Sequence, residues 1–194
     1  MHFSSAALAV FAATAAAQNA STPARNVVPA TYDGKCFYPK PDIGFDLKSY
    51  VGRWYQVAGT PQPFNAACKC TYAQYSINDN GSVRVNNTCQ AGNRAISILG
   101  TATPAPPQYG ATGVFTVLFP GERPADCPGP NYIVQDYTGD FSLVQNNNLT
   151  TLFLLSREQH PKPEVLDAWI KRAGLLGSDI SQVVKTDQTD CQFL

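Results

Sequence analysis

Short segments in which apolar and polar residues alternate run through most of this chain and limit what it can fold into. Alternation with a period of two is typical of strands that bury one face. The Asn80-Gly81 pair between two such segments is a strong signal for a tight β-hairpin. The pattern is found in segments 54–59, 68–77, 82–89, 95–103, 113–119, 131–137, 141–145 and 150–156. We therefore expect eight sequential antiparallel strands.

One later segment has a helical pattern instead. Pro163 at the first position, Glu164 in the first turn and Gly174 after the end favour a helix over Pro163–Ala173. The apolar side chains on one stripe of this helix are Val165, Leu166, Trp169, Ile170 and Ala173. We expect that stripe to cover the outer face of the hairpin that carries Phe141 and Leu143. Eight antiparallel strands with one outer helix predict an all-β, up-and-down barrel with room for one small ligand.

The amino-terminal part divides into a leader and an arm. Residues 1–17 contain no Asp, Glu, Lys or Arg and end in a small-x-small pattern, which predicts a signal peptide cleaved near Gln18. Residues 18–48 are rich in Pro, Gly, Ser, Thr and Asn and are expected to form an irregular arm that leads to a barrel domain over 49–194. No later apolar run approaches the ~20 residues that span a bilayer. We expect a secreted, extracellular protein without a transmembrane segment.

Charge and cysteine content limit the partners. The chain has 14 basic and 14 acidic residues and no basic run, so nucleic acid is not an expected partner. An even number of cysteines in a secreted chain predicts three disulfides and leaves their pairing open. Zinc is disfavoured because Cys68-x-Cys70 lacks the usual gap and His160 is the one histidine after the leader. No metal or cofactor is expected, and sequons for N-glycosylation occur at Asn19, Asn80, Asn86 and Asn148.

Three motifs in order make the chain resemble the lipocalins. They are Gly52-x-Trp54, Asp136-Tyr137 within NYIVQDYTGDFSLV, and LLSREQHP with Arg157. Within that family the chain is most similar to the group of apolipoprotein D, bacterial lipocalins and bilin-binding proteins, from Cys36 to Cys191. The resemblance implies a cup closed at one end by Gly52, Trp54 and Arg157, with the guanidinium across the indole. It also implies that Asp136-Tyr137 is structural.

The resemblance also implies a disulfide scheme. The cysteine that pairs with the equivalent of Cys36 in the family is absent here, where its place is near Asn147, and Cys127 opens the neighbouring strand. Cys36–Cys127 is therefore expected. Cys70 matches the family position that pairs with the tail, which gives Cys70–Cys191 and leaves Cys68–Cys89 at the ends of one hairpin. An exchange of Cys68 and Cys70 is the alternative.

The leading functional hypothesis is a secreted carrier of a small hydrophobic molecule such as a sterol, fatty acid, terpenoid or pigment. Two alternatives are a lipocalin-like enzyme that isomerises or de-epoxidises a lipid, and a surface-interaction protein with a filled barrel. An enzyme is disfavoured because six cysteines suit three disulfides and the single histidine after the expected leader, His160, gives no Ser/His/Asp set. Alternation predicts that the ligand contacts Tyr75, Val85, Asn87, Ile98, Phe115, Val117, Phe119, Tyr132, Val134, Phe153 and Leu155.

Overall fold

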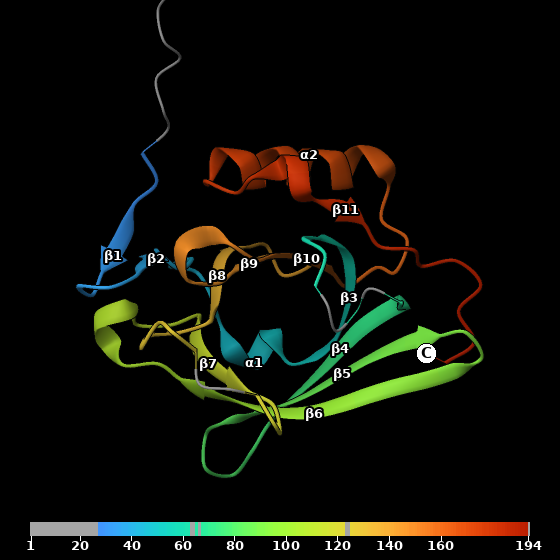
Figure 1. Cartoon of the computed structure of the whole chain (residues 1–194), viewed down its shortest axis with the longest axis horizontal. Coiled ribbons are helices and arrows are strands. Elements are labelled where there is room, and N and C mark those ends of the chain that lie inside the picture. Colours follow the sequence, from blue (N-terminus) through green and yellow to red (C-terminus); the bar gives the residue numbers. More distant parts are fainter. Residues whose placement is uncertain (1–26, 63–64, 66, 123–124, 194) are drawn as a thin grey trace, which may run out of the picture.

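The computed structural model describes residues 27–62, 65, 67–122 and 125–193. The expected signal peptide over residues 1–17 and the sequon at Asn19 lie outside the described residues. The architecture is an antiparallel β-barrel with one long helix packed on its outside (Figure 1).

Eight strands form the barrel wall, and each is hydrogen-bonded to the strand that follows it in sequence. They are β3 (Gly52–Gly59), β4 (Lys69–Ile77), β5 (Val83–Ala91), β6 (Arg94–Pro104), β7 (Val114–Leu118), β8 (Tyr132–Tyr137), β9 (Phe141–Gln145) and β10 (Leu152–Ser156). The sheet closes because β10 also pairs with β3, with Phe153 opposite Gly59 and Ser156 opposite Tyr55. A ninth strand, β11 (Val184–Lys185), pairs with β3 outside the barrel. The expected eight-stranded up-and-down barrel is confirmed.

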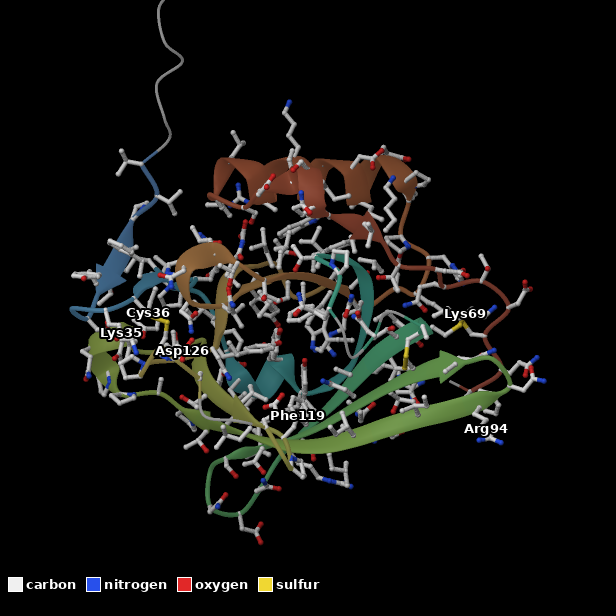
Figure 2. All side chains as sticks on the ribbon, viewed as in Figure 1. Lys35, Cys36, Lys69, Arg94, Phe119 and Asp126 are labelled. Atoms are coloured by element: carbon white, nitrogen blue, oxygen red, sulfur yellow. A yellow bond between two sulfur atoms is a disulfide. The ribbon has the colours of Figure 1, made fainter. Side chains whose placement is uncertain are left out.

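The barrel wall is uneven. β5 and β6 pair along their whole lengths, whereas β7 pairs only with the last part of β6, Thr101–Pro104. In the described part of the chain, residues 94–100 of β6 therefore have a strand neighbour on one side only. Figure 1 shows β5 and β6 extending beyond the rest of the barrel, and Figure 2 places Arg94 at the tip of that extension. The barrel is deepest on the β4–β6 side.

A side chain completes the weak junction between β7 and β8, which share only two residue pairs. The backbone N–H of Val117 donates to Asn131 Oδ1 at 2.7 Å, and Asn131 Nδ2 donates to the Val117 carbonyl at 2.8 Å. The amide of Asn131 thus takes the place of a backbone peptide group in the ladder.

The described part of the expected arm, residues 27–48, is more ordered than its composition indicates, so the expectation of an irregular arm over residues 18–48 is corrected for that part. Strands β1 (Ala30–Tyr32) and β2 (Phe37–Pro39) form an antiparallel pair, and a helical turn, α1 (Leu47–Tyr50), precedes the barrel. Asp33 supplies the local order: its carboxylate accepts from the Cys36 N–H at 2.8 Å and from the Tyr38 hydroxyl at 2.7 Å. These polar contacts have no hydrophobic periodicity, so the pattern of the sequence did not reveal them.

The long helix, α2 (Pro163–Leu175), begins at the expected proline and ends two residues beyond the expected Ala173. It covers the outer face of β9, where the rings of Phe141 and Trp169 stack with their centroids 5.3 Å apart. Leu143 is fully buried beneath the helix. Arg172 on the helix forms an ion pair with Asp136 on β8, so Asp136 has a structural contact.

The carboxyl-terminal tail fills a gap in the wall between β3 and β4. These strands pair only over Gly52–Tyr55 and 72–75, and beyond that point Gln188 Nε2 donates to the carbonyls of Gln56 and Thr71, both at 2.9 Å. One amide therefore bridges two strands that no longer bond to each other. Within the ranges that the structure describes, short 3₁₀ turns also occur at η2 (Pro107–Tyr109), η3 (Asn147–Leu149) and η4 (Ile180–Gln182).

Three disulfides tie the peripheral segments to the barrel. They join Cys36 to Cys127, Cys68 to Cys89 and Cys70 to Cys191. These are the pairs that the resemblance implies, and the exchange of Cys68 and Cys70 does not occur. The first holds the arm (Figure 2), the second closes the end of the β4–β5 hairpin, and the third holds the tail.

Candidate functional site

The barrel encloses a cavity of about 420 Å³. Apolar and aromatic side chains from the inner faces of the strands make most of its wall, and ten of the eleven expected contact residues line it. These ten are Tyr75, Val85, Asn87, Ile98, Phe115, Val117, Phe119, Tyr132, Phe153 and Leu155. A cavity of this size and lining is typical of a site for one small apolar ligand.

Val134 is the expected contact residue that does not line the cavity. Its side chain is fully buried in the apolar cluster that contains Trp54, so it packs the interior instead of facing a ligand. The register shift of β8 comes only after Val134, between Val134 and Asp136, so it does not explain this difference. Alternation predicts which face of a strand a residue occupies, and it does not show how close to the closed end of the barrel that residue lies.

Further residues line the cavity besides the expected contact residues. Tyr50 enters from the helical turn before β3, while Ala73, Val83 and Ala102 continue the inner faces of β4, β5 and β6. Polar residues line the cavity from the loops between strands, namely Gln62, Asn65, Glu122, Asn131, Asn146 and Thr151. The inner-face residues follow from the same alternation, whereas the loop residues carry no periodic signal.

The cavity opens on the side where β6 has no second neighbour. Ile96 and Ile98 both line it, yet they expose 53% and 44% of their surface. Ile98 was expected to face inward, and it is only half enclosed because β7 does not extend far enough to cover it. Phe119, marked in Figure 2, packs against Gly100 of β6 just beyond this opening, where an added Cβ would lie 2.6 Å from its ring.

The opposite end is closed by a tryptophan and an arginine. Trp54 is fully buried, and the guanidinium carbon of Arg157 lies 3.8 Å from the centroid of its ring. Arg157 also donates to three backbone carbonyls, those of Ser49, Val51 and Arg53, at 2.7–3.0 Å. Gly52, between Val51 and Arg53, has a backbone φ of +97°, which residues other than glycine rarely adopt. The glycine therefore lets the chain turn around the guanidinium.

Above this floor, four hydroxyl groups form a connected row that we call the hydroxyl chain. Tyr75 Oη lies 3.2 Å from Tyr132 Oη, Tyr132 Oη lies 2.8 Å from Tyr50 Oη, and Tyr50 Oη lies 3.0 Å from Ser142 Oγ. The three tyrosines line the cavity, and Ser142 is fully buried behind them. Burial raises the pKa of Tyr75 to about 12 and the pKa values of Tyr50 and Tyr132 well above their ordinary value. All three phenols therefore keep their protons at neutral pH.

The other chemistry-bearing residues do not gather in the cavity. All six cysteines are in disulfides, and the described part of the chain has no group of three or more His, Cys, Asp or Glu that could hold a metal ion. Within the same ranges, no helix has the length and apolarity needed to cross a membrane. The sequon asparagines Asn80 and Asn148 are exposed, while Asn86 is half-buried on β5.

Comparison with known proteins places this architecture in a family. A family model described as a lipocalin-like domain matches residues 45–188. Apolipoprotein D of Mus musculus is 27% identical over 176 residues, covering 81% of this chain and 85% of the relative. Temperature-induced lipocalin-1 of Arabidopsis thaliana is 28% identical over 153 residues, covering 76% of this chain and 81% of the relative.

Solved structures show the same fold. Insecticyanin from the tobacco hornworm Manduca sexta superimposes with a TM-score of 0.57 at 21% identity, covering 81% of this chain and 91% of that one. Lobster apocrustacyanin A1 superimposes with a TM-score of 0.58 at 19% identity, covering 75% of this chain and 81% of that one. Together with the closed barrel, the outer helix and the domain match over most of the chain, these findings identify the protein as a member of the lipocalin family.

Proposed function

We propose that this lipocalin is a secreted carrier that binds one small hydrophobic molecule reversibly inside its barrel. The observation that carries the proposal is the cavity of about 420 Å³, lined mainly by apolar and aromatic side chains and open beside β6. Three disulfides are typical of proteins that function outside the cell. The similarity to apolipoprotein D supports the same interpretation.

The two alternative functions are less well supported. A filled barrel would leave no cavity of this volume. A thiol-dependent lipid enzyme needs an unpaired cysteine, whereas each of the six is bonded to another. The carrier remains the function that the geometry favours.

The expected affinity follows from the apolar surface that a ligand would bury. A molecule of sterol or fatty-acid size would remove roughly 400 Å² of apolar surface from water, which is nominally about 10 kcal/mol. Lost translational and rotational freedom costs at least ~4 kcal/mol. The remaining ~6 kcal/mol corresponds to a Kd of tens of micromolar, and larger ligands would approach 1 μM.

Two measurements test the carrier proposal. The protein purified under native conditions from the medium of its own secreting cells is extracted with organic solvent, and mass spectrometry identifies any co-purified molecule. The delipidated protein is then titrated with a fluorescent apolar probe, which sterols, fatty acids and terpenoids compete to displace. We expect saturable uptake of one probe per chain. Failure to take up any probe would contradict the proposal.

A further inference from the structure

The hydroxyl chain has one more hydrogen than it can use internally. Each hydroxyl has one hydrogen to donate and lone pairs to accept, so four groups supply four donors. The chain has three contacts, Tyr75 to Tyr132, Tyr132 to Tyr50, and Tyr50 to Ser142, and each uses one hydrogen. In the described part of the chain, these four oxygens make no further hydrogen bond. One O–H is therefore left without a partner among the described protein groups.

The place of this unmatched donor matters because a buried hydroxyl without a partner is costly. Leaving such a group unsatisfied costs roughly 1–3 kcal/mol. Three of the four hydroxyls belong to side chains that line the cavity, while Ser142 does not reach it. An acceptor atom on a ligand at the bottom of the cavity is therefore the natural partner for the unmatched hydrogen.

The charge of the cavity restricts what that acceptor can be. Apart from the tyrosines, the one acidic or basic side chain among the described lining residues is Glu122, which is exposed, so the described lining offers no cationic group. The guanidinium of Arg157 lies across Trp54 and is already bonded to three carbonyls. An anionic head group at the hydroxyl chain would be desolvated without a cation, which is strongly unfavourable.

We propose that the cavity selects a neutral ligand whose carbonyl oxygen enters first and accepts a hydrogen bond from the hydroxyl chain, with its apolar remainder toward the opening. This inference rests on the carrier function proposed above and names the ligand chemistry of that site. The apolar walls formed by Phe115, Val117 and Phe153 would contact the remainder of the molecule. The raised pKa values of the three tyrosines keep these groups protonated, so they act as donors throughout the neutral range.

The experiment compares three ligands with the same hydrocarbon length. Methyl palmitate carries a neutral carbonyl, hexadecane carries no acceptor, and palmitate is an anion at a pH well above the pKa of its carboxyl group. The affinity of each ligand is measured by its ability to displace a fluorescent apolar probe from the delipidated full chain. We expect the ester to bind roughly 2- to 10-fold more tightly than the alkane, the range for one net hydrogen bond. We expect palmitate to bind more weakly than the ester and to gain affinity as the pH is lowered.

The variants remove the hydroxyls without changing the shape of the wall. The test variant is Tyr50→Phe with Tyr75→Phe and Tyr132→Phe, which deletes all three hydroxyls of the hydroxyl chain that line the cavity. The control is Tyr32→Phe with Tyr55→Phe, which deletes hydroxyls from residues that do not line the cavity. The test variant is expected to lose the preference for the ester and still bind the alkane, and the control is expected to keep that preference.

A spectroscopic measurement separates a hydrogen bond from a better fit. The infrared carbonyl stretch of isotope-labelled methyl palmitate is expected at lower frequency in the native protein than in hydrocarbon solvent. The shift is expected to disappear in the Tyr50→Phe, Tyr75→Phe, Tyr132→Phe variant. Probe uptake without ester preference, tighter palmitate binding, or an unshifted carbonyl would refute this inference and leave the carrier proposal intact. No uptake by any ligand would refute both.

Discussion

Arg157 covers the ring of Trp54 from outside the barrel, with its guanidinium carbon 3.8 Å from the ring centroid. The same guanidinium bonds to the carbonyls of Ser49, Val51 and Arg53, which lead the chain into β3. One side chain therefore closes the barrel, shields the indole and fixes the entrance of the first barrel strand. The planar guanidinium of arginine can stack on the ring and donate hydrogen bonds at its edge at the same time. The tetrahedral ammonium of lysine cannot stack in this way while donating to all three carbonyls.

The first prediction concerns this closed end. Trp54→Ala is expected to lower the free energy of unfolding by ~3–5 kcal/mol through the cavity that it leaves. Arg157→Ala is expected to cost ~1–3 kcal/mol because it removes the cation–π contact and three hydrogen bonds. The matched control is Arg53→Ala, whose guanidinium carbon lies 4.4 Å from the ring centroid of Tyr72 and not over Trp54. Urea unfolding measures all three, and equal losses for Arg157→Ala and Arg53→Ala would contradict the assignment.

Which parts of the fold were predictable depends on the kind of signal that each part carries. Alternation located the barrel strands because one face of each is buried, as at Tyr75 and Val85. The pair β1–β2 has three residues in each strand and is held by polar contacts to Asp33, which have no period. The role of Gln188 was equally hidden, since a lone glutamine near the carboxyl terminus gives no sign that it bridges two strands.

The second prediction concerns the tail. Replacing Cys70 and Cys191 by serine opens a covalent link between residues 121 apart in the sequence, and the Cys68–Cys89 link spans only 21. In the chain-entropy description the longer link contributes roughly 5 kcal/mol and the shorter roughly 3. We expect the Cys70→Ser, Cys191→Ser variant to melt at the lower temperature of the two double variants. Amide hydrogen exchange, measured by mass spectrometry, is also expected to be faster around Gln188 in this variant, because the tail is released from the β3–β4 gap. The reverse order of melting temperatures would contradict the prediction.

The third prediction concerns acid stability of the arm. Hydrogen bonds from the Cys36 N–H and the Tyr38 hydroxyl lower the pKa of Asp33 to about 2. Because the folded pKa lies below the unfolded value near 3.9, the carboxylate stabilises the fold above about pH 4, and this contribution is lost as the pH falls toward 2. The Tm of the native protein is expected to fall more steeply between pH 4 and pH 2 than that of Asp33→Asn. Parallel Tm curves for the two proteins would show that Asp33 makes no such contribution.

The cavity was predictable in outline but not in chemistry. The inner faces of the strands identified most of the lining, including Tyr75 and Tyr132, since a barrel of eight strands must turn one face inward. That these two phenols join Tyr50 and Ser142 in one row depends on side chains from four separate elements meeting above Trp54. The sequence pattern does not predict this contact, because the shear and closure of the barrel determine which side chains meet.

The last prediction uses two phenylalanines on opposite faces of the same wall. Phe153 on β10 lines the cavity, whereas Phe141 on β9 faces outward and stacks on Trp169 of α2. Phe153→Ala removes wall that a ligand would contact and is expected to weaken probe binding by roughly 5- to 10-fold, equivalent to losing some 40–60 Å² of apolar contact. Phe141→Ala is expected to cost ~3 kcal/mol of stability and leave probe affinity unchanged, as is Arg84→Ala on the exposed face of β5. Titration of the three variants at a temperature where all remain folded decides the matter: if Phe141→Ala weakens binding as much as Phe153→Ala, then overall stability and not cavity shape controls uptake.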